Sequence, residues 1–153
     1  MKFLPLVCVL ALSFGPLCAQ PVSSGSAAVL PDASQIIATL KKQFDQPDAP
    51  LTVVPVTVVG DYAVAGWIQG KKGGRALLQK EQGQWRISVC AGDGLTQASV
   101  LETTGMQPAL ARKLANAVAI AEAKLTAEQR RLFASFQGML TVNAASGHGH
   151  HTK

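Results

Sequence analysis

Hydrophobic residues recur along the chain with two different periods, which separate helical from strand-forming segments. After Asp32, apolar residues fall on one face at helical intervals until Pro47, and this spacing predicts a first helix. Asp32 and Gln35 have the spacing of an N-cap and its N3 partner. From Leu51 to Cys90 the pattern changes to short β-rich runs divided by turn residues, which predicts a four-stranded antiparallel meander. The runs are 51–59, 62–69, 75–80 and 84–90.

Period-two alternation predicts which side chains of a strand share a face. In the second run both faces are rather apolar, which indicates that helices cover at least one face of the sheet. Pro55 removes a hydrogen-bond donor from the first run, so we expect that strand at an edge or at a bulge. In the last run, alternation predicts one face made of Trp85, Ile87 and Val89 and the other made of Arg86, Ser88 and Cys90.

Helical stretches follow the meander, at about 95–101, 108–125 and 126–137, and a short apolar run at 139–142 suggests a final strand. Asp93 can cap the first stretch, and Pro108 suits the first position of the second. Thr126 and Gln129 form a capping-box pair at the start of the third. The predicted fold class is α+β: an N-terminal helix, a four-stranded antiparallel meander, then two or three C-terminal helices packed on the sheet.

The first nineteen positions have the pattern of a secretory signal peptide. Met1 and Lys2 begin it with positive charge, an apolar run follows to Leu17, and small Ala19 marks the expected cleavage site. The run is shorter than the roughly 20 residues that cross a bilayer, so we expect no membrane span in the mature form rather than an uncleaved anchor. The expected organisation is signal peptide 1–19, flexible linker 20–31, a single domain 32–142 and a disordered histidine-containing tail 143–153, located in the periplasm.

Charge argues against nucleic acid as a partner. The 153 residues carry a formal charge of +5, which becomes +4 when Lys2 leaves with the signal. The remaining basic residues are scattered in pairs rather than gathered in a stripe, and nucleic-acid binding needs a clustered basic face.

Cleavage would leave Cys90 as the single cysteine, which cannot form an internal disulfide. Cys90 is then either a buried small hydrophobe or a soft metal ligand, with Met106 and Met139 as candidate thioether partners.

All three histidines lie in the tail, at His148, His150 and His151. Closely spaced imidazoles on a flexible backbone suit Zn, Cu or Ni, with modest and pH-dependent affinity. Because residues 32–142 contain no histidine, no Ser/His/Asp or Cys/His arrangement can form within them, and we expect no enzyme activity.

Several motifs of the chain resemble the copper uptake system-associated proteins. They are the turn DQPDAPL at 45–51, AGW at 65–67, GGRALL at 73–78, and the stretch from Trp85 to CAGD at 90–93, followed by an Ala-rich helix and the histidines. The resemblance covers the chain from about Asp45 onward. It implies an exported bacterial protein associated with copper handling, without an established catalytic activity.

The resulting hypothesis is a periplasmic accessory protein of copper uptake or handling. Its tail would bind Cu(II) through imidazoles, while Cys90 with a methionine would offer a Cu(I) site; the expected partners are copper and envelope copper-transport proteins. A second hypothesis is an adaptor that binds an envelope transport protein and holds no metal. A third is a thiol enzyme, which would require an activated Cys90 thiolate.

Overall fold

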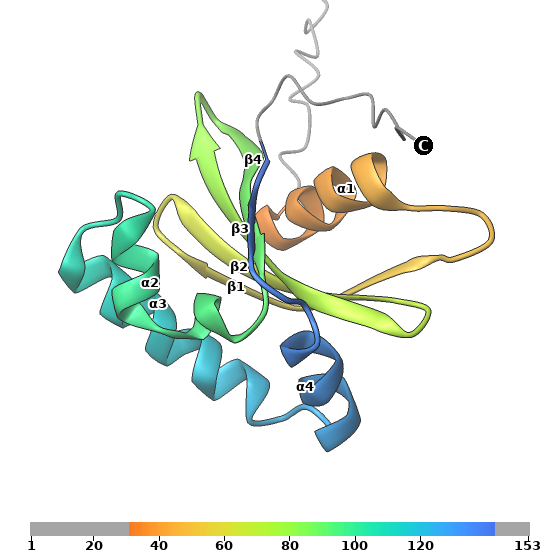
Figure 1. Cartoon of the computed structure of the whole chain (residues 1–153). Helices are drawn as coiled ribbons and strands as arrows, with labels where there is room; N and C mark the ends of the chain where they lie inside the picture. The colour runs from red at the N-terminus through yellow and green to blue at the C-terminus, as the bar shows by residue number, and fades with distance from the viewer. Residues whose placement is uncertain (1–30, 143–153) are drawn as a thin grey trace, which may run out of the picture.

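The computed structural model describes residues 31–142, in which one antiparallel sheet has helices on both faces (Figure 1). The strands are hydrogen-bonded in chain order: β1 (Leu51–Val59), β2 (Tyr62–Gln69), β3 (Lys72–Glu81), β4 (Gln84–Ala91) and β5 (Met139–Thr141). The helices are α1 (Asp32–Phe44), the short 3₁₀ helix η1 (Asp93–Thr96), α2 (Ala98–Thr103), α3 (Pro108–Glu122) and α4 (Ala127–Ala134). The α+β architecture predicted from the sequence is confirmed, and the apolar run at 139–142 supplies the short fifth strand.

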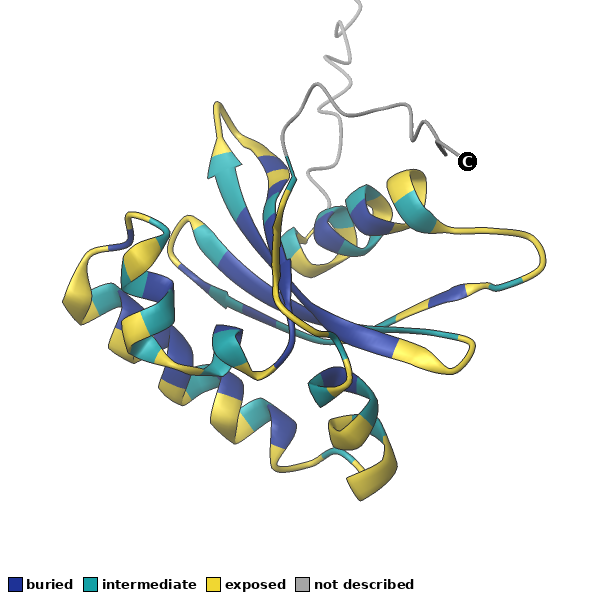
Figure 2. Cartoon of the chain, viewed as in Figure 1, coloured by how far each residue is buried: buried dark blue, intermediate teal, exposed yellow. Residues whose placement is uncertain are grey.

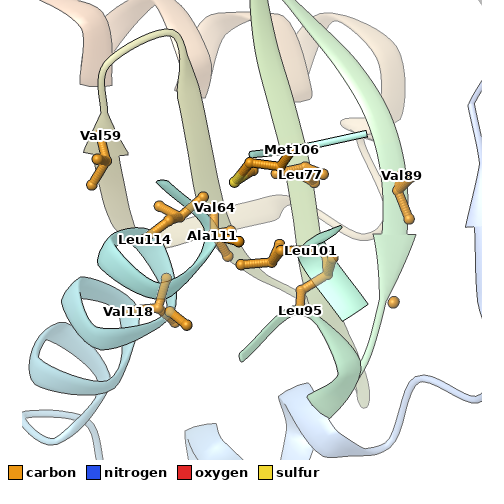
Figure 3. Close-up of a cluster of buried hydrophobic side chains, with 12 residues drawn as sticks. Val59, Val64, Leu77, Val89, Leu95, Leu101, Met106, Ala111, Leu114 and Val118 are labelled. Carbon is orange, nitrogen blue, oxygen red and sulfur yellow. The ribbon is translucent and has the colours of Figure 1, made fainter. Parts of the chain in front are cut away.

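The sheet is buried on both faces, as its apolar second strand indicated. One face packs against η1, α2 and α3 through a cluster that includes Val64, Leu77, Leu101, Met106 and Leu114 (Figure 3). The other face packs against α1, where Ile36 and Leu40 contact strand residues (Figure 1). The central strands and the inner sides of the helices are accordingly buried, whereas the turns are exposed (Figure 2). Burial of these two apolar surfaces is the main force that holds the layers together.

Strand β1 forms one edge of the sheet, and its pairing with β2 shifts register between Val53 and Val56. The shift surrounds Pro55, which has no N–H to donate. The prediction of an edge or bulge at Pro55 is therefore confirmed.

Strand β3 begins at Lys72, earlier than the predicted start at Arg75, because two glycines belong to the strand rather than to the turn. A Cβ atom at Gly73 would lie 3.0 Å from the backbone of Leu132, and one at Gly74 would lie 2.8 Å from the ring of Trp67. These glycines allow α4 and an aromatic ring to approach the strand closely.

Two of the three predicted helix caps are wrong. Asp32 is the first residue of α1 rather than its cap, and its Oδ1 accepts hydrogen bonds from Lys80 Nζ (2.7 Å) and Trp85 Nε1 (3.0 Å). The bond from Lys80, followed by the bond from Trp85, lowers the pKa of this carboxyl. Asp93 begins η1 without a capping bond from its side chain, and the helix expected at 95–101 is divided into η1 and α2. The capping box of Thr126 and Gln129 is confirmed at the start of α4.

Within residues 31–142, no helix is both long and apolar enough to span a membrane.

Candidate functional site

Cys90 lies on the same face of the sheet as Ile87, whereas strict alternation predicted that the two residues would lie on opposite faces. Ile87 pairs with Leu78 while Val89 pairs with Leu77, so Ser88 is an extra residue in β4. A bulge of this kind reverses the alternation beyond it. Ile87 and Cys90 therefore share the α1 face, and Val89 turns toward α3.

The Cys90 thiol is buried among apolar side chains of that face. The residue is 6% exposed, and burial raises the pKa of the thiol to about 11. At neutral pH the group is therefore a protonated thiol, whereas a nucleophile or metal ligand needs the thiolate. Among residues 31–142, no basic side chain lowers this pKa, so the described geometry gives no support to the thiol-enzyme hypothesis.

The two methionine candidates differ in how far they are buried and in where they lie along the chain. Met106 is 3% exposed and belongs to the α3-side cluster (Figure 3), on the opposite face of the sheet from Cys90. Met139 is 47% exposed in β5, where it pairs with Ala91. The structure therefore does not bring Cys90 and Met106 together as a sulfur site.

His148, His150 and His151 lie outside the described residues, so their arrangement stays a prediction. Within residues 31–142, no group of three His, Cys, Asp or Glu side chains is placed to hold a metal ion.

The most notable polar cluster is one that the sequence reasoning missed. Arg75 of β3 is 3% exposed, and it forms a two-pronged ion pair with Glu122 of α3: Nε to Oε1 and Nη2 to Oε2, each 2.7 Å. Its Nη1 donates to Asp93 Oδ1 at 3.1 Å, and its Cζ lies 5.3 Å from the ring centroid of Phe133. The Asp93 carboxylate therefore accepts a hydrogen bond from Arg75 and does not form the predicted helix cap.

The charges in this cluster stabilise one another. Burial by itself lowers the pKa of Arg75, but the hydrogen bonds and charge of Glu122, followed by the charge of Asp93, outweigh burial and raise that pKa. Each of the three guanidinium nitrogens donates to a carboxylate, and these two carboxylates balance the charge that would otherwise attract an anion. Its role is to tie β3, η1 and α3 together.

A sequence signal for this cluster existed. Glu122 continues the helical stripe of Leu114 and Val118 at intervals of four residues, which places a carboxylate on the buried face of α3. Arg75 lies two residues before Leu77, and the two side chains therefore share one face of β3. The apolar face of α3 and the apolar face of β3 pack together, and each contains one charged residue. Opposite charges on two faces that pack together indicate a buried ion pair.

The turn between α1 and β1 encloses a shallow hollow of about 340 Å³ lined by Asp45, Gln46, Pro47 and Pro50. Polar groups around it maintain the turn: Asp45 Oδ1 accepts from the N–H of Leu51 (2.6 Å), and Gln69 Nε2 donates to the carbonyl of Ala49 (2.8 Å). The polar groups at the hollow therefore hold the turn in place by bonding to backbone groups.

Comparisons of the chain with protein-family models, curated proteins and solved structures found no match. The resemblance to the copper uptake system-associated proteins therefore stays a prediction from the motifs.

Proposed function

We propose that this protein is an exported copper-handling protein that binds copper through its C-terminal segment. In this proposal His148, His150 and His151 supply imidazoles for Cu(II). The folded body carries that segment on β5 and takes no part in catalysis. Its partners would be copper and, in the envelope, proteins that transport it.

The observation that carries this proposal is where the candidate sulfur ligands lie. Cys90 and Met106 are 6% and 3% exposed on opposite faces of the sheet, so in the folded structure neither sulfur is presented to an ion in solution. Met139, by contrast, is exposed in β5, the element that leads directly into the histidine-bearing segment. The proposed metal ligands therefore all lie within residues 139–153, and Cys90 is not one of them.

Copper is favoured among the metals that imidazole binds. Nitrogen ligands bind Cu(II) more tightly than the other divalent first-row metals, and a thioether adds affinity for Cu(I). The motif resemblance to copper-associated proteins points the same way. Because imidazole must be neutral to coordinate a metal, binding should weaken as pH falls through the histidine range.

A Cu(II) titration of the purified exported protein tests the imidazole ligands, with electron paramagnetic resonance to detect nitrogen coordination. We expect simultaneous replacement of His148, His150 and His151 by alanine to abolish stoichiometric Cu(II) binding. The matched control is Cys90→Ala, which should bind as the unaltered protein does. Unchanged binding by the triple variant, or lost binding by a folded Cys90→Ala variant, would contradict the proposal.

A Cu(I) titration under reducing conditions tests the thioether. Met139→Leu should weaken Cu(I) binding, while Met106→Leu, a matched change at a buried site, should not. Should neither oxidation state bind, the adaptor hypothesis takes its place, and a partner captured from envelope extract equally well with and without copper would support it.

A further inference from the structure

The edge of β4 is longer than the strand that covers it. β5 pairs with Val89, Cys90 and Ala91, and the N–H of Val142 donates to the carbonyl of Ser88 at 2.8 Å. Between residues 31 and 142, no strand pairs with the rest of this edge, from Gln84 to Ile87.

The backbone groups of Trp85 point toward this uncovered edge. Gln82 and Gly83 both have positive φ, 50° and 78°, as in a two-residue hairpin turn, so the flanking residues Glu81 and Gln84 face each other. Hydrogen-bonding direction then alternates, and Lys80 should face away from β4. It does, because its N–H donates to the carbonyl of Asp61 at 2.7 Å.

Trp85, which is opposite Lys80, therefore directs its N–H and C=O away from β3, and Ile87 does the same two residues further on. Yet Trp85 is only 4% exposed and Ile87 only 7%. Water thus has little access to these residues, and buried backbone groups are almost always hydrogen-bonded. The outward-facing N–H and C=O groups of Trp85 and Ile87 therefore need hydrogen-bond partners, which a further strand beside β4 would supply.

We propose that residues 143–147 form this partner strand and continue β5 along β4. The segment Asn-Ala-Ala-Ser-Gly contains no proline, so each of its residues has the N–H that a ladder needs, and it contains no charge. The chain enters it from Val142, which is already bonded to β4. Because Ser88 is the extra residue of the bulge, it has no partner of its own in the continued ladder, and Ala144 would pair with Trp85. The N–H of Ala144 would then face β4, and the N–H of Ala145 would face outward.

Connectivity favours this occupant over a second copy of the chain. A segment joined directly to Val142 closes no loop and loses no translational freedom when it pairs, whereas a second molecule loses both translation and rotation. The opposite edge of the sheet, β1, contains Pro55 and a register shift, which make it a poor template for pairing.

The pairing has a consequence that rests on the proposed function. It places His148 near the β3–β4 turn, and the nine residues from Met139 span about 30 Å when extended. The imidazoles and the Met139 thioether would then bind copper at separate places. Met139→Leu should accordingly leave Cu(II) binding unchanged.

Amide hydrogen exchange of the metal-free protein, followed residue by residue by NMR, tests the pairing. We expect the Trp85 amide to exchange slowly, and Ala144→Pro to accelerate it roughly fivefold to tenfold by removing the inward donor. Ala145→Pro is the matched control, because its N–H faces outward and its loss should leave Trp85 protected. Exchange at Leu77 in the core reports whether each variant stays folded.

Three outcomes overturn the proposal: fast exchange of Trp85 in the unaltered protein, slow exchange that neither proline changes, or equal acceleration by both. Protection that rises with protein concentration identifies a second copy as the occupant instead. Because copper is absent throughout, failure here leaves the copper proposal standing, and failure of the copper titrations leaves this result standing.

Discussion

Replacing Glu122 by glutamine should destabilise the fold strongly, because it removes a charge while hardly changing shape. Arg75 and Glu122 are 3% and 7% exposed, so water cannot solvate the guanidinium once its partner is neutral. Glutamine can also accept only one of the two hydrogen bonds that Nε and Nη2 now donate. Removing one member of a buried ion pair costs about 3–5 kcal/mol. Because Asp93 still contacts Arg75 at 3.1 Å, we expect the lower end, about 3 kcal/mol.

Urea unfolding followed by circular dichroism measures this loss as a lower midpoint with an unchanged slope. The matched control is Glu128→Gln, which removes a partner of Arg131 in a pair whose side chains are 65% and 75% exposed. That change should cost less than about 1 kcal/mol. A similarly small loss for Glu122→Gln would refute the reasoning. Conversely, Arg75→Met combined with Glu122→Leu should cost less than Glu122→Gln alone, because no unpaired charge stays buried.

Two further predictions concern the thiol and a packed glycine. Burial raises the pKa of Cys90 from 9.0 to about 11, so the unfolded chain loses this proton first; stability should fall by up to about 3 kcal/mol as pH rises across that interval. Cys90→Ala should lack this part of the pH dependence in urea titrations, and equal slopes for both proteins would count against a buried thiol. Gly66→Ala should cost about 1–3 kcal/mol, since its Cβ would lie 2.6 Å from the ring of Phe133. Gly94→Ala, whose Cβ would meet Val100 at an ordinary 3.4 Å, should be close to neutral in the same thermal unfolding assay, and equal losses would argue against the tight packing at Gly66.

Most secondary-structure elements could be predicted because their signals are local. The runs at 51–59 and 62–69 coincide with β1 and β2, since Gly60 and Asp61 mark the turn between them. The capping box of Thr126 and Gln129 was equally readable, because both partners lie within one turn of helix. Gly73 and Gly74 misled the prediction: glycine permits a turn, but it also permits the close packing by Leu132 and Trp67 that occurs here.

The candidate site was harder to predict, because its geometry depends on contacts between distant segments. The extra residue at Ser88 leaves no mark in the apolar pattern, yet it decides the face on which Cys90 lies. The side chain of Asp93 had a plausible local partner in the following helix, but it binds Arg75, eighteen residues away.

The sequence by itself determined the order of most of the elements, the edge or bulge at Pro55, and the position of all three histidines after residue 142. Those features follow from chain periodicity and turn chemistry, which act over a few residues. Only the tertiary structure decided that Cys90 and Met106 are buried on opposite faces, that Arg75 pairs with Glu122 across 47 residues, and that β5 pairs with only part of β4. These features depend on how apolar surfaces from distant parts of the chain pack together. Packing excludes water, so polar groups buried in the contact must form hydrogen bonds or ion pairs with one another.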